Sequence, residues 1–152
     1  MKVRAAAPTD SVAWAALRHA LWPDADAGAL ADEVLAFLSG DVAPAVLAAA
    51  FVAEASDGAL LGMIELSLHP YADGCASSPV PYIEGWYVIE GHRGRGIGGA
   101  LVKAAENWAR KRGHTELASD ARLDNIVSER AHKALGFDEV ERAIRFRKAL
   151  QP

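Results

Sequence analysis

The chain has 152 residues, of which 51% are hydrophobic and 24% charged, a composition typical of a globular protein with one hydrophobic core. Its net charge of −4 argues against nucleic acid as the main partner, and no apolar run reaches the roughly 20 residues that cross a bilayer. The N-terminal "MKVRAAAPTDS" lacks the apolar core of a signal peptide, and a single cysteine, Cys75, fits a reducing compartment. We therefore expect a cytoplasmic protein without membrane contact, folded as one domain over residues 1–152.

The first half of the chain predicts a strand, two helices and a pair of strands. Residues 2–6 form the first strand, and N-caps at residues 9–11 start a helix that Pro23 ends. Apolar residues at helical spacing predict a second helix over residues 30–38. Residues 46–55 and 60–68 are predicted strands joined at the turn signal Asp57-Gly58. In the second of these strands Glu65 and Ser67 share one face, away from the apolar one.

The second half begins with a long loop over residues 69–81, a length at which loops are often functional. A strand over residues 82–89, a helix from Ile97 to Gly113 and a strand "TELAS" follow. Asp124 is the predicted cap of a further helix that Gly136 ends, and "AIRFRKAL", residues 143–150, is the predicted last strand. An antiparallel front half followed by a βαβα unit predicts an α+β fold, with a mixed, mostly antiparallel central sheet flanked by helices.

A glycine-rich loop connects the strand over residues 82–89 to the helix that follows it. Glycines 94, 96, 98 and 99 remove side chains in front of a helix N-terminus, and Arg93 and Arg95 add positive charge. Unpaired N–H groups and the helix dipole favour an anion at such a place, so the loop predicts a site for a phosphate or pyrophosphate. The alternative is a glycine-rich turn with solvated arginines.

Two nucleotide folds fit this loop less well. "GRGIGG" matches the dinucleotide pattern G-x-G-x-x-G, and Asp120 lies about 20 residues further on. That fold, however, places the loop after its first strand and needs several βαβ units behind it. A P-loop is excluded because the G-K-[ST] ending is missing.

The motif "RGRGIG", residues 93–98, resembles the R/Q-x-x-G-x-G/A signature of the GCN5-related N-acetyltransferase (GNAT) superfamily. The predicted element order and the pattern of Asn125, Ala131 and "LGF" at residues 135–137 agree with this family. The resemblance implies the order β-α-α-β-β-β-α-β-α-β and acetyl-CoA as cosubstrate, without a metal. By the same resemblance, the pyrophosphate is bound at the loop, and a backbone N–H of the splayed fourth strand, near Val88, stabilises the tetrahedral oxyanion. The cofactor-binding residues so implied are Trp86, Tyr87, Val88, Arg93, Gly94, Arg95, Gly96, Ile97, Gly98, Gly99 and Asn125.

Four blocks resemble the aminoglycoside 6'-N-acetyltransferases more specifically. They are "LRHALWP" (17–23), "DGCASSPVPYIEGWYV" (73–88), "ELASDARLDN" (116–125) and "HKALGFDEVERAIRFRK" (132–148). This resemblance implies direct acetyl transfer to the 6'-amine of an aminoglycoside, antibiotic resistance and a homodimer. The positions implied to contact the drug are Glu84, Asp120 and Glu141.

Carboxylates are what a site for a polycation needs, and two of them stand out in the sequence. Glu84 lies inside an apolar strand, where it predicts a buried carboxylate on the face of Tyr82, Trp86 and Val88. Asp120 ends the next strand, where parallel sheets often place ligands. Because acetyl transfer needs a neutral amine, either acid is a candidate base. A structural ion pair with arginine is the alternative for Glu84, and a loop cap for Asp120.

Other side chains have two possible roles each, or none. Trp22 and Tyr71 flank the expected cleft in chain order, and aromatic faces suit sugar rings and cations, although core packing is the usual role of such residues. His132 stands where many relatives carry the tyrosine that protonates the leaving thiolate, so it is a candidate acid or an ordinary helix residue. Cys75 has no evident base partner, and the histidines lack metal-ligand spacing.

Two further functions fit parts of the pattern. A polyamine or peptide amine would suit the acidic residues equally well, but the "LWP" and "GCASSPV" blocks favour the drug. A regulatory domain that binds acyl-CoA without turnover would not need Glu84 and Asp120.

Overall fold

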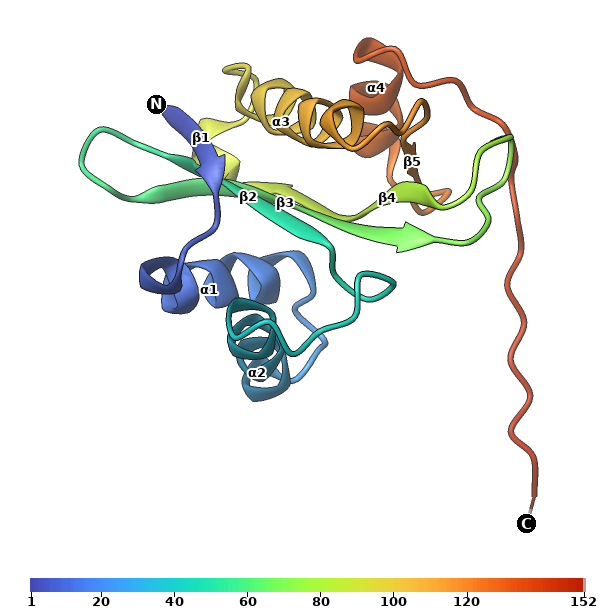
Figure 1. The fold of residues 1–152 in the computed structure, drawn as a ribbon, viewed down its shortest axis with the longest axis horizontal. Helices are drawn as coiled ribbons and strands as arrows, with labels where there is room; N and C mark the ends of the chain where they lie inside the picture. The colour runs from blue at the N-terminus through green and yellow to red at the C-terminus, as the bar shows by residue number, and fades with distance from the viewer. Residues whose placement is uncertain (152) are drawn as a thin grey trace. The chain divides into compact units, whose positions relative to one another are not determined.

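The computed structural model describes residues 1–151 and contains two compact units, Met1–Asp120 and a second that begins at Ala121. Figure 1 labels the elements. The first unit contains β1 (Lys2–Ala5), α1 (Ser11–Leu21), α2 (Ala27–Leu38), β2 (Ala49–Glu54), β3 (Leu60–His69), β4 (Val80–Val88), α3 (Ile97–Lys111) and β5 (Ala118–Ser119). Short 3-10 turns occupy Pro8–Asp10 and Glu90–His92, and the second unit contains α4 (Ile126–Ala134).

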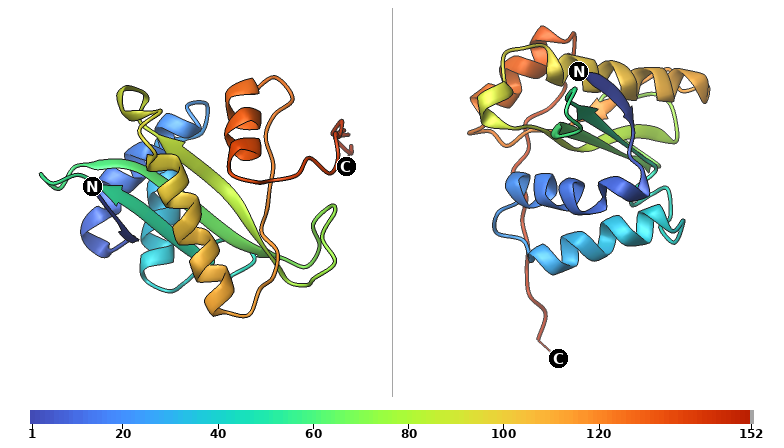
Figure 2. Two further views of the ribbon diagram at one scale, coloured as in Figure 1. Left: turned by 90° about the horizontal axis from the view of Figure 1, so that it is seen from above. Right: turned by 90° about the vertical axis from the view of Figure 1, so that its left-hand side faces the viewer.

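The five strands form one sheet in the order β1-β2-β3-β4-β5. All neighbours are antiparallel except β4 and β5, which are parallel. The prediction of a mixed, mostly antiparallel sheet is therefore confirmed. Helices α1 and α2 cover one face of the sheet and α3 covers the other, as Figures 1 and 2 show. Both faces of the central strands are thus buried.

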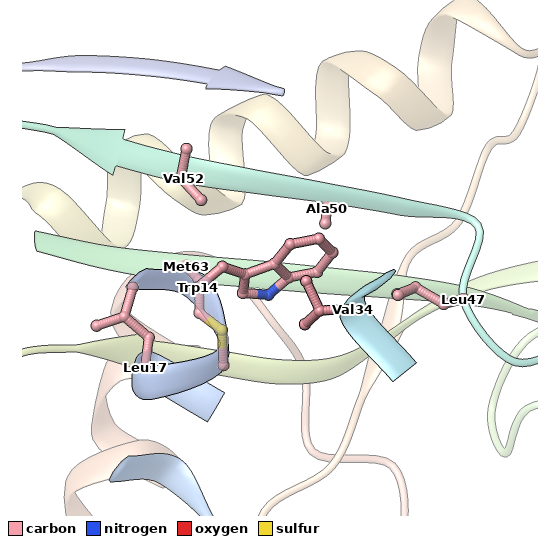
Figure 3. Packing of buried hydrophobic residues seen from close by; sticks show 7 residues of the cluster. All are labelled: Trp14, Leu17, Val34, Leu47, Ala50, Val52 and Met63. Atoms are coloured by element: carbon pink, nitrogen blue, oxygen red, sulfur yellow. The ribbon is translucent and has the colours of Figure 1, made fainter. Parts of the chain in front are cut away.

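The main core lies between the sheet and helices α1 and α2 (Figure 3). Helical spacing brings Trp14 and Leu17 of α1 to the same side, and strand alternation does the same for Ala50 and Val52 of β2. The Trp14 indole is fully buried and meets Phe37 edge-on, with 5.6 Å between ring centroids. This packing holds the C-terminal half of α1 close to β3 and β4, where the candidate site is found.

The predicted strand over residues 143–150 is wrong. After α4 the structure has no strand within residues 1–151, and the side chains of Ile144 and Phe146 are 78% and 90% exposed. Apolar alternation alone does not make a strand, because its N–H and C=O groups need a partner edge. The predicted strand "TELAS" is likewise reduced to Ala118–Ser119.

The predicted cap of the last helix is also displaced by one residue. The Asn125 side chain accepts a hydrogen bond of 3.0 Å from the backbone N–H of Ser128 at the start of α4. Asp124 instead pairs with Arg122, with Oδ1 and Nε 3.1 Å apart. This ion pair lowers the pKa of Asp124.

Candidate functional site

A β-bulge in β4 sets the position of Glu84. In the pairing with β3, Ile83 lies opposite Leu66 and Gly85 lies opposite Glu65, so Glu84 is an extra residue without an opposite partner. A bulge of this kind breaks the regular alternation of side chains and redirects those next to it. Glu84 is therefore placed by an irregularity that strand alternation cannot predict.

The bulge separates Glu84 from the aromatic residue that follows it. Glu84 contacts Ser67, whereas Trp86 lies opposite Ile64. Ser67 and Ile64 are three residues apart on β3 and so lie on opposite faces of the sheet. The prediction that Glu84 shares a face with Trp86 and Val88 is therefore wrong.

Glu84 is held by two polar neighbours rather than buried in apolar surroundings. The Ser67 hydroxyl donates a hydrogen bond to its Oε1, and His69 Nε2 lies 2.5 Å from the same oxygen. The His69 ring in turn stacks on Tyr82, with 4.2 Å between centroids. The Glu84 side chain is 37% exposed, so the predictions of a buried carboxylate and of an arginine partner are both wrong.

A pocket of about 360 Å³ opens beside Glu84 on the side of the sheet that α1 and α2 cover. Its walls come from α1, α2, the segment before β2, and strands β3 and β4. The lining residues are Arg18, Trp22, Glu33, Val42, Val46, Leu47, Glu65 and Glu84. Trp22 leans over the bulge: a Cβ on Gly85 would lie 2.9 Å from Cη2 of its indole. The structure thus brings Trp22 and Glu84 into one pocket.

A buried ion pair forms the floor of this pocket. Glu65 is 1% exposed and accepts a 2.6 Å hydrogen bond from Trp14 Nε1. Arg18 Nε lies 2.9 Å from the same carboxylate, and its Nη2 lies 2.8 Å from Glu33. Burial raises the pKa of Glu65, and Arg18 and the indole N–H counteract that shift. The Arg18 guanidinium also lies 5.2 Å from the Trp22 ring centroid, which fixes one wall of the pocket.

Sequence reasoning missed Arg18 and Glu65. Strand alternation places Glu65 and Ser67 on the polar face of β3, but helices α1 and α2 cover that face, so both side chains are buried. The signal in the sequence was Glu65, an ionisable residue inside an otherwise apolar strand. A buried carboxylate of this kind needs a partner of opposite charge.

The charge of the pocket is negative. Glu33, Glu65 and Glu84 face one guanidinium, that of Arg18. Even when Glu65 holds a proton, two carboxylates oppose one cation. A concave wall of this sign attracts cationic ligands and repels anions.

The second predicted acid lies next to Glu84 in strand register. Tyr82 pairs with Ala118 and Ile83 with Ser119, so Glu84 and Asp120 are the residues that come next on the two parallel strands. Asp120 is exposed at the end of β5. Each of the two acids thus follows the last paired residue of its strand, at the point where β4 and β5 part.

The loop between β3 and β4, residues 70–79, carries Tyr71 and is braced at its far end. Tyr71 is 67% exposed, and its hydroxyl donates a 2.9 Å hydrogen bond to Asp73. Glu116 accepts bonds of 2.7 Å from the backbone N–H and 2.6 Å from the hydroxyl of Ser77, which lower the pKa of Glu116. Burial, followed by the nearby Glu116, raises the pKa of the Cys75 thiol. A nucleophilic role for Cys75 would need the opposite shift.

The glycine loop forms a cradle in front of α3. Gly94 and Gly96 adopt φ angles of 72° and 79°, the left-handed region that glycine favours. Gly96 caps α3, and the first intrahelical bond runs from the Ala100 N–H to its carbonyl. The three N–H groups of residues 97–99 therefore have no intrahelical acceptor and point out of the helix start. This arrangement fits the oxygens of a phosphate group.

Arg93 ties this loop to the end of β4. Its Nε donates a 2.9 Å hydrogen bond to the Val88 carbonyl, and its guanidinium lies 5.5 Å from the centroid of the Tyr87 ring. Trp86 packs against α3, because a Cβ on Gly98 would lie 3.0 Å from its indole. Trp86 and Tyr87 thus support the loop, whereas Arg95 is exposed.

The edge of β4 is open where the loop begins. The Ile89 N–H bonds to Leu61 of β3, so the preceding N–H, that of Val88, faces the other edge of the strand. Within residues 1–151 the pairing of that edge with β5 covers only Tyr82 and Ile83. The Val88 N–H therefore faces the gap where β4 and β5 have separated.

Three predicted residues lie in the second compact unit. Asn125 caps α4 through its side chain. His132 Nδ1 lies 2.7 Å from the carbonyl of Ser128, one helical turn earlier, and its ring meets Phe137 edge-on. Glu141 is exposed. The contacts described for Asn125 and His132 are thus with residues of their own unit.

We expect the substitution Gly96→Ala to weaken the binding of CoA. No atom lies within 4 Å of a Cβ at this position, but the φ of 79° would cost an alanine about 1–2 kcal/mol. Relief of this strain would turn the N–H groups away from the phosphates, and we expect the Kd for CoA to rise about tenfold in calorimetry.

Gly91→Ala is the matched control, because Gly91 also has open space around a Cβ but no positive φ. An equal loss of CoA affinity in both variants would contradict the assignment.

Two kinds of site are absent from residues 1–151. No group of three or more His, Cys, Asp or Glu side chains is arranged to hold a metal ion. In the same part of the chain no helix is both long and apolar enough to span a bilayer.

Comparison with known proteins agrees with this geometry. Residues 14–137 match the acetyltransferase (GNAT) family. Aminoglycoside N(6')-acetyltransferase type 1 of Klebsiella aerogenes is 50% identical over 97% of this chain and 96% of its own. The structure of AAC(6')-Iy with the bisubstrate analog CoA-S-monomethyl-acetylneamine has a TM-score of 0.87 and 37% identity, covering 98% of both chains. The structure of the same enzyme with CoA has a TM-score of 0.88 and 37% identity, covering 98% of this chain and 95% of that one.

Proposed function

Because this chain belongs to the acetyltransferase (GNAT) family, we propose that it transfers the acetyl group of acetyl-CoA to the 6'-amine of aminoglycoside antibiotics. The observation that carries this proposal is the negative pocket that Trp22 and Glu84 share, next to the open edge of β4. The similarity to aminoglycoside N(6')-acetyltransferases extends over nearly the whole chain. The polyamine alternative has no comparable support.

The proposed site for acetyl-CoA runs from the start of α3 to the end of β4. The N–H groups of residues 97–99 would bind the pyrophosphate, with Gly94 and Gly96 leaving room and Arg95 adding charge. Arg93 is engaged with Val88 and would act by holding the loop. Asn125 remains a proposed contact, in addition to its role as a cap.

The drug would lie in the pocket with its amines against carboxylates. Glu84 and Asp120 are the proposed partners of the reacting end, and the Trp22 ring offers a face to a sugar ring. Tyr71 and Glu141 are proposed to contact the drug further out. An excess of carboxylates favours a polycation over a neutral sugar.

The reaction needs a neutral 6'-amine, and we assign the removal of its proton to Glu84. Its Oε1 is occupied by Ser67 and His69, which leaves Oε2 for the ammonium. The N–H of Val88 would then donate to the acetyl oxygen as negative charge develops on it. Asp120 is the alternative base, and His132 stays a proposed donor of a proton to the leaving thiolate.

We further propose that the protein is a cytoplasmic homodimer that confers aminoglycoside resistance as a single domain over residues 1–152. The exposed apolar Ile144 and Phe146 in the segment after α4 support pairing with a second copy. Light scattering would measure the dimer, and the concentration of tobramycin that inhibits an expressing strain would measure resistance. A monomer, or an unchanged inhibitory concentration, would overturn the respective proposal.

The test of the activity uses two classes of drug. Purified protein is mixed with acetyl-CoA and either kanamycin or tobramycin, and free thiol is measured over time. Paromomycin, which carries a hydroxyl in place of the 6'-amine, is the control. Thiol release with the amine drugs alone supports the proposal. Binding of CoA without release by any of the three would refute it.

A further inference from the structure

We propose that His69 is a positioning residue for Glu84 and that protonation of its imidazole switches this carboxylate off. The proposal rests on the function proposed above, in which Glu84 Oε2 accepts the proton of the drug. It adds a residue for which neither the sequence motifs nor the family similarity assigns a role.

The contacts of Glu84 are divided between its two oxygens. Ser67, which is fully buried, and His69 both contact Oε1. Among residues 1–151 no hydrogen bond reaches Oε2. Because an ionised carboxylate only accepts hydrogen bonds, His69 donates its Nε2–H to Oε1. This leaves Oε2 available to a ligand in the pocket that Glu84 lines.

His69 itself is held in place by a stacked ring while its side chain stays partly exposed. The ring stacks on Tyr82 with an angle of 7° between the planes, and the side chain is 33% exposed. The bulge leaves Glu84 without a strand neighbour, so its side chain depends on these two contacts for its orientation. Loss of the imidazole would let the carboxylate swing within the pocket.

The charge of the imidazole decides how well Glu84 works. A neutral imidazole donates one hydrogen bond and leaves the carboxylate charge intact. An imidazolium keeps that bond, but it neutralises the carboxylate and repels a cationic drug. Imidazole is the side chain whose charge ordinarily changes between pH 5 and 8, so the contact links drug turnover to pH.

The other ionisable groups near this pair come from α1, α2, β3 and β4, and from Asp120, the residue that follows β5. Tyr82 faces the imidazole from β4, and Arg18 of α1, Glu33 of α2 and Glu65 of β3 line the pocket that Glu84 shares. They are the same in the wild-type protein and in a His69 variant. A comparison of the two proteins across pH therefore isolates the charge of His69.

The experiment compares wild-type protein, His69→Gln and His69→Ala by thiol release with tobramycin at pH 6 and pH 8. Gln retains an N–H donor for Oε1 but carries no titratable charge. We expect His69→Ala to raise the KM for tobramycin about tenfold or more at both pH values, with the KM for acetyl-CoA within about twofold of wild type. We expect His69→Gln to remain within about threefold of wild type at pH 8.

The ratio of kcat/KM at pH 8 to kcat/KM at pH 6 shows whether the charge of His69 matters, or only its contact with Glu84. Between pH 8 and pH 6 the wild-type kcat/KM should fall about threefold to tenfold more than that of His69→Gln. His114→Gln is the control, because this histidine stacks on Trp108 just after α3, and its ratio should equal that of wild type. Thermal unfolding of each variant verifies that it is folded.

Each outcome decides the proposal. An unchanged KM for tobramycin in His69→Ala overturns the proposal. So does an equal ratio of kcat/KM at pH 8 to that at pH 6 in wild type and His69→Gln. Neither result affects the proposed acetyltransferase activity. A wild-type protein that releases no thiol with tobramycin refutes the proposed function, and the role of His69 falls with it.

Discussion

Glu84→Gln lowers kcat/KM for tobramycin by about 10²–10⁴-fold, the range that loss of a general base produces. Glutamine has nearly the same shape, and its carbonyl oxygen can still accept from Ser67 and His69. It cannot take a proton from the drug ammonium, so kcat falls rather than KM alone. Steady-state kinetics by thiol release measure this change, and calorimetry with CoA verifies that the acetyl-CoA site is intact.

Two further substitutions show whether the loss belongs to Glu84 alone. Glu33→Gln is the control within the same pocket: Glu33 pairs with Arg18 and its side chain is 60% exposed, so we expect a few-fold rise in KM and an unchanged kcat. Asp120→Asn separates the two acids at the end of β5. Should Glu84→Gln keep its kcat while Asp120→Asn loses it, Asp120 is the base and Glu84 only binds.

Arg18→Met lowers the free energy of unfolding by about 3–5 kcal/mol at pH 7, because it leaves the carboxylate of Glu65 buried without its counter-charge. The side chains of Arg18 and Glu65 are 9% and 2% exposed, so water cannot replace the lost partner. The Trp14 N–H supplies one hydrogen bond to Glu65 but no charge. Urea unfolding, followed by fluorescence, measures the change.

A double variant and the pH dependence test the cause of this loss. Glu65→Gln in the Arg18→Met background removes the buried charge and should recover part of the stability. Burial raises the pKa of Glu65, so protonation in the folded state relieves the unpaired charge. The difference in the free energy of unfolding between wild type and Arg18→Met should therefore become smaller as the pH falls through the folded-state pKa of Glu65. A loss below about 1 kcal/mol at pH 7 would mean that Glu65 is already neutral in the folded protein.

Local signals in the sequence were sufficient for most of the architecture. Apolar spacing and Pro23 predicted α1, and the Asp57-Gly58 signal predicted the turn between β2 and β3. The glycine loop in front of α3 is a local feature too, since its conformation depends on residues that follow one another in the chain. These features arise from interactions within a few residues, so they can be read from one segment at a time.

Contacts between distant segments decided the environment of the site. The bulge opposite Glu65 turned Glu84 away from Trp86, and the parallel pairing of β4 with β5 ends at the residues just before Glu84 and Asp120. The pair of Arg18 and Glu65 joins residues 47 positions apart (65 − 18 = 47) and is buried only because α1 packs on β3.

The predicted strand over residues 143–150 also depended on contacts with a distant segment. Residues 143–150 have the apolar alternation of a strand, yet within residues 1–151 no partner edge pairs with them. By itself, the sequence determined the family, the order of nearly all elements and the glycine loop in front of α3, because these depend on local conformation. Only the tertiary structure decided which carboxylates share a pocket, because a strand register and the burial of a charge depend on residues far apart in the chain.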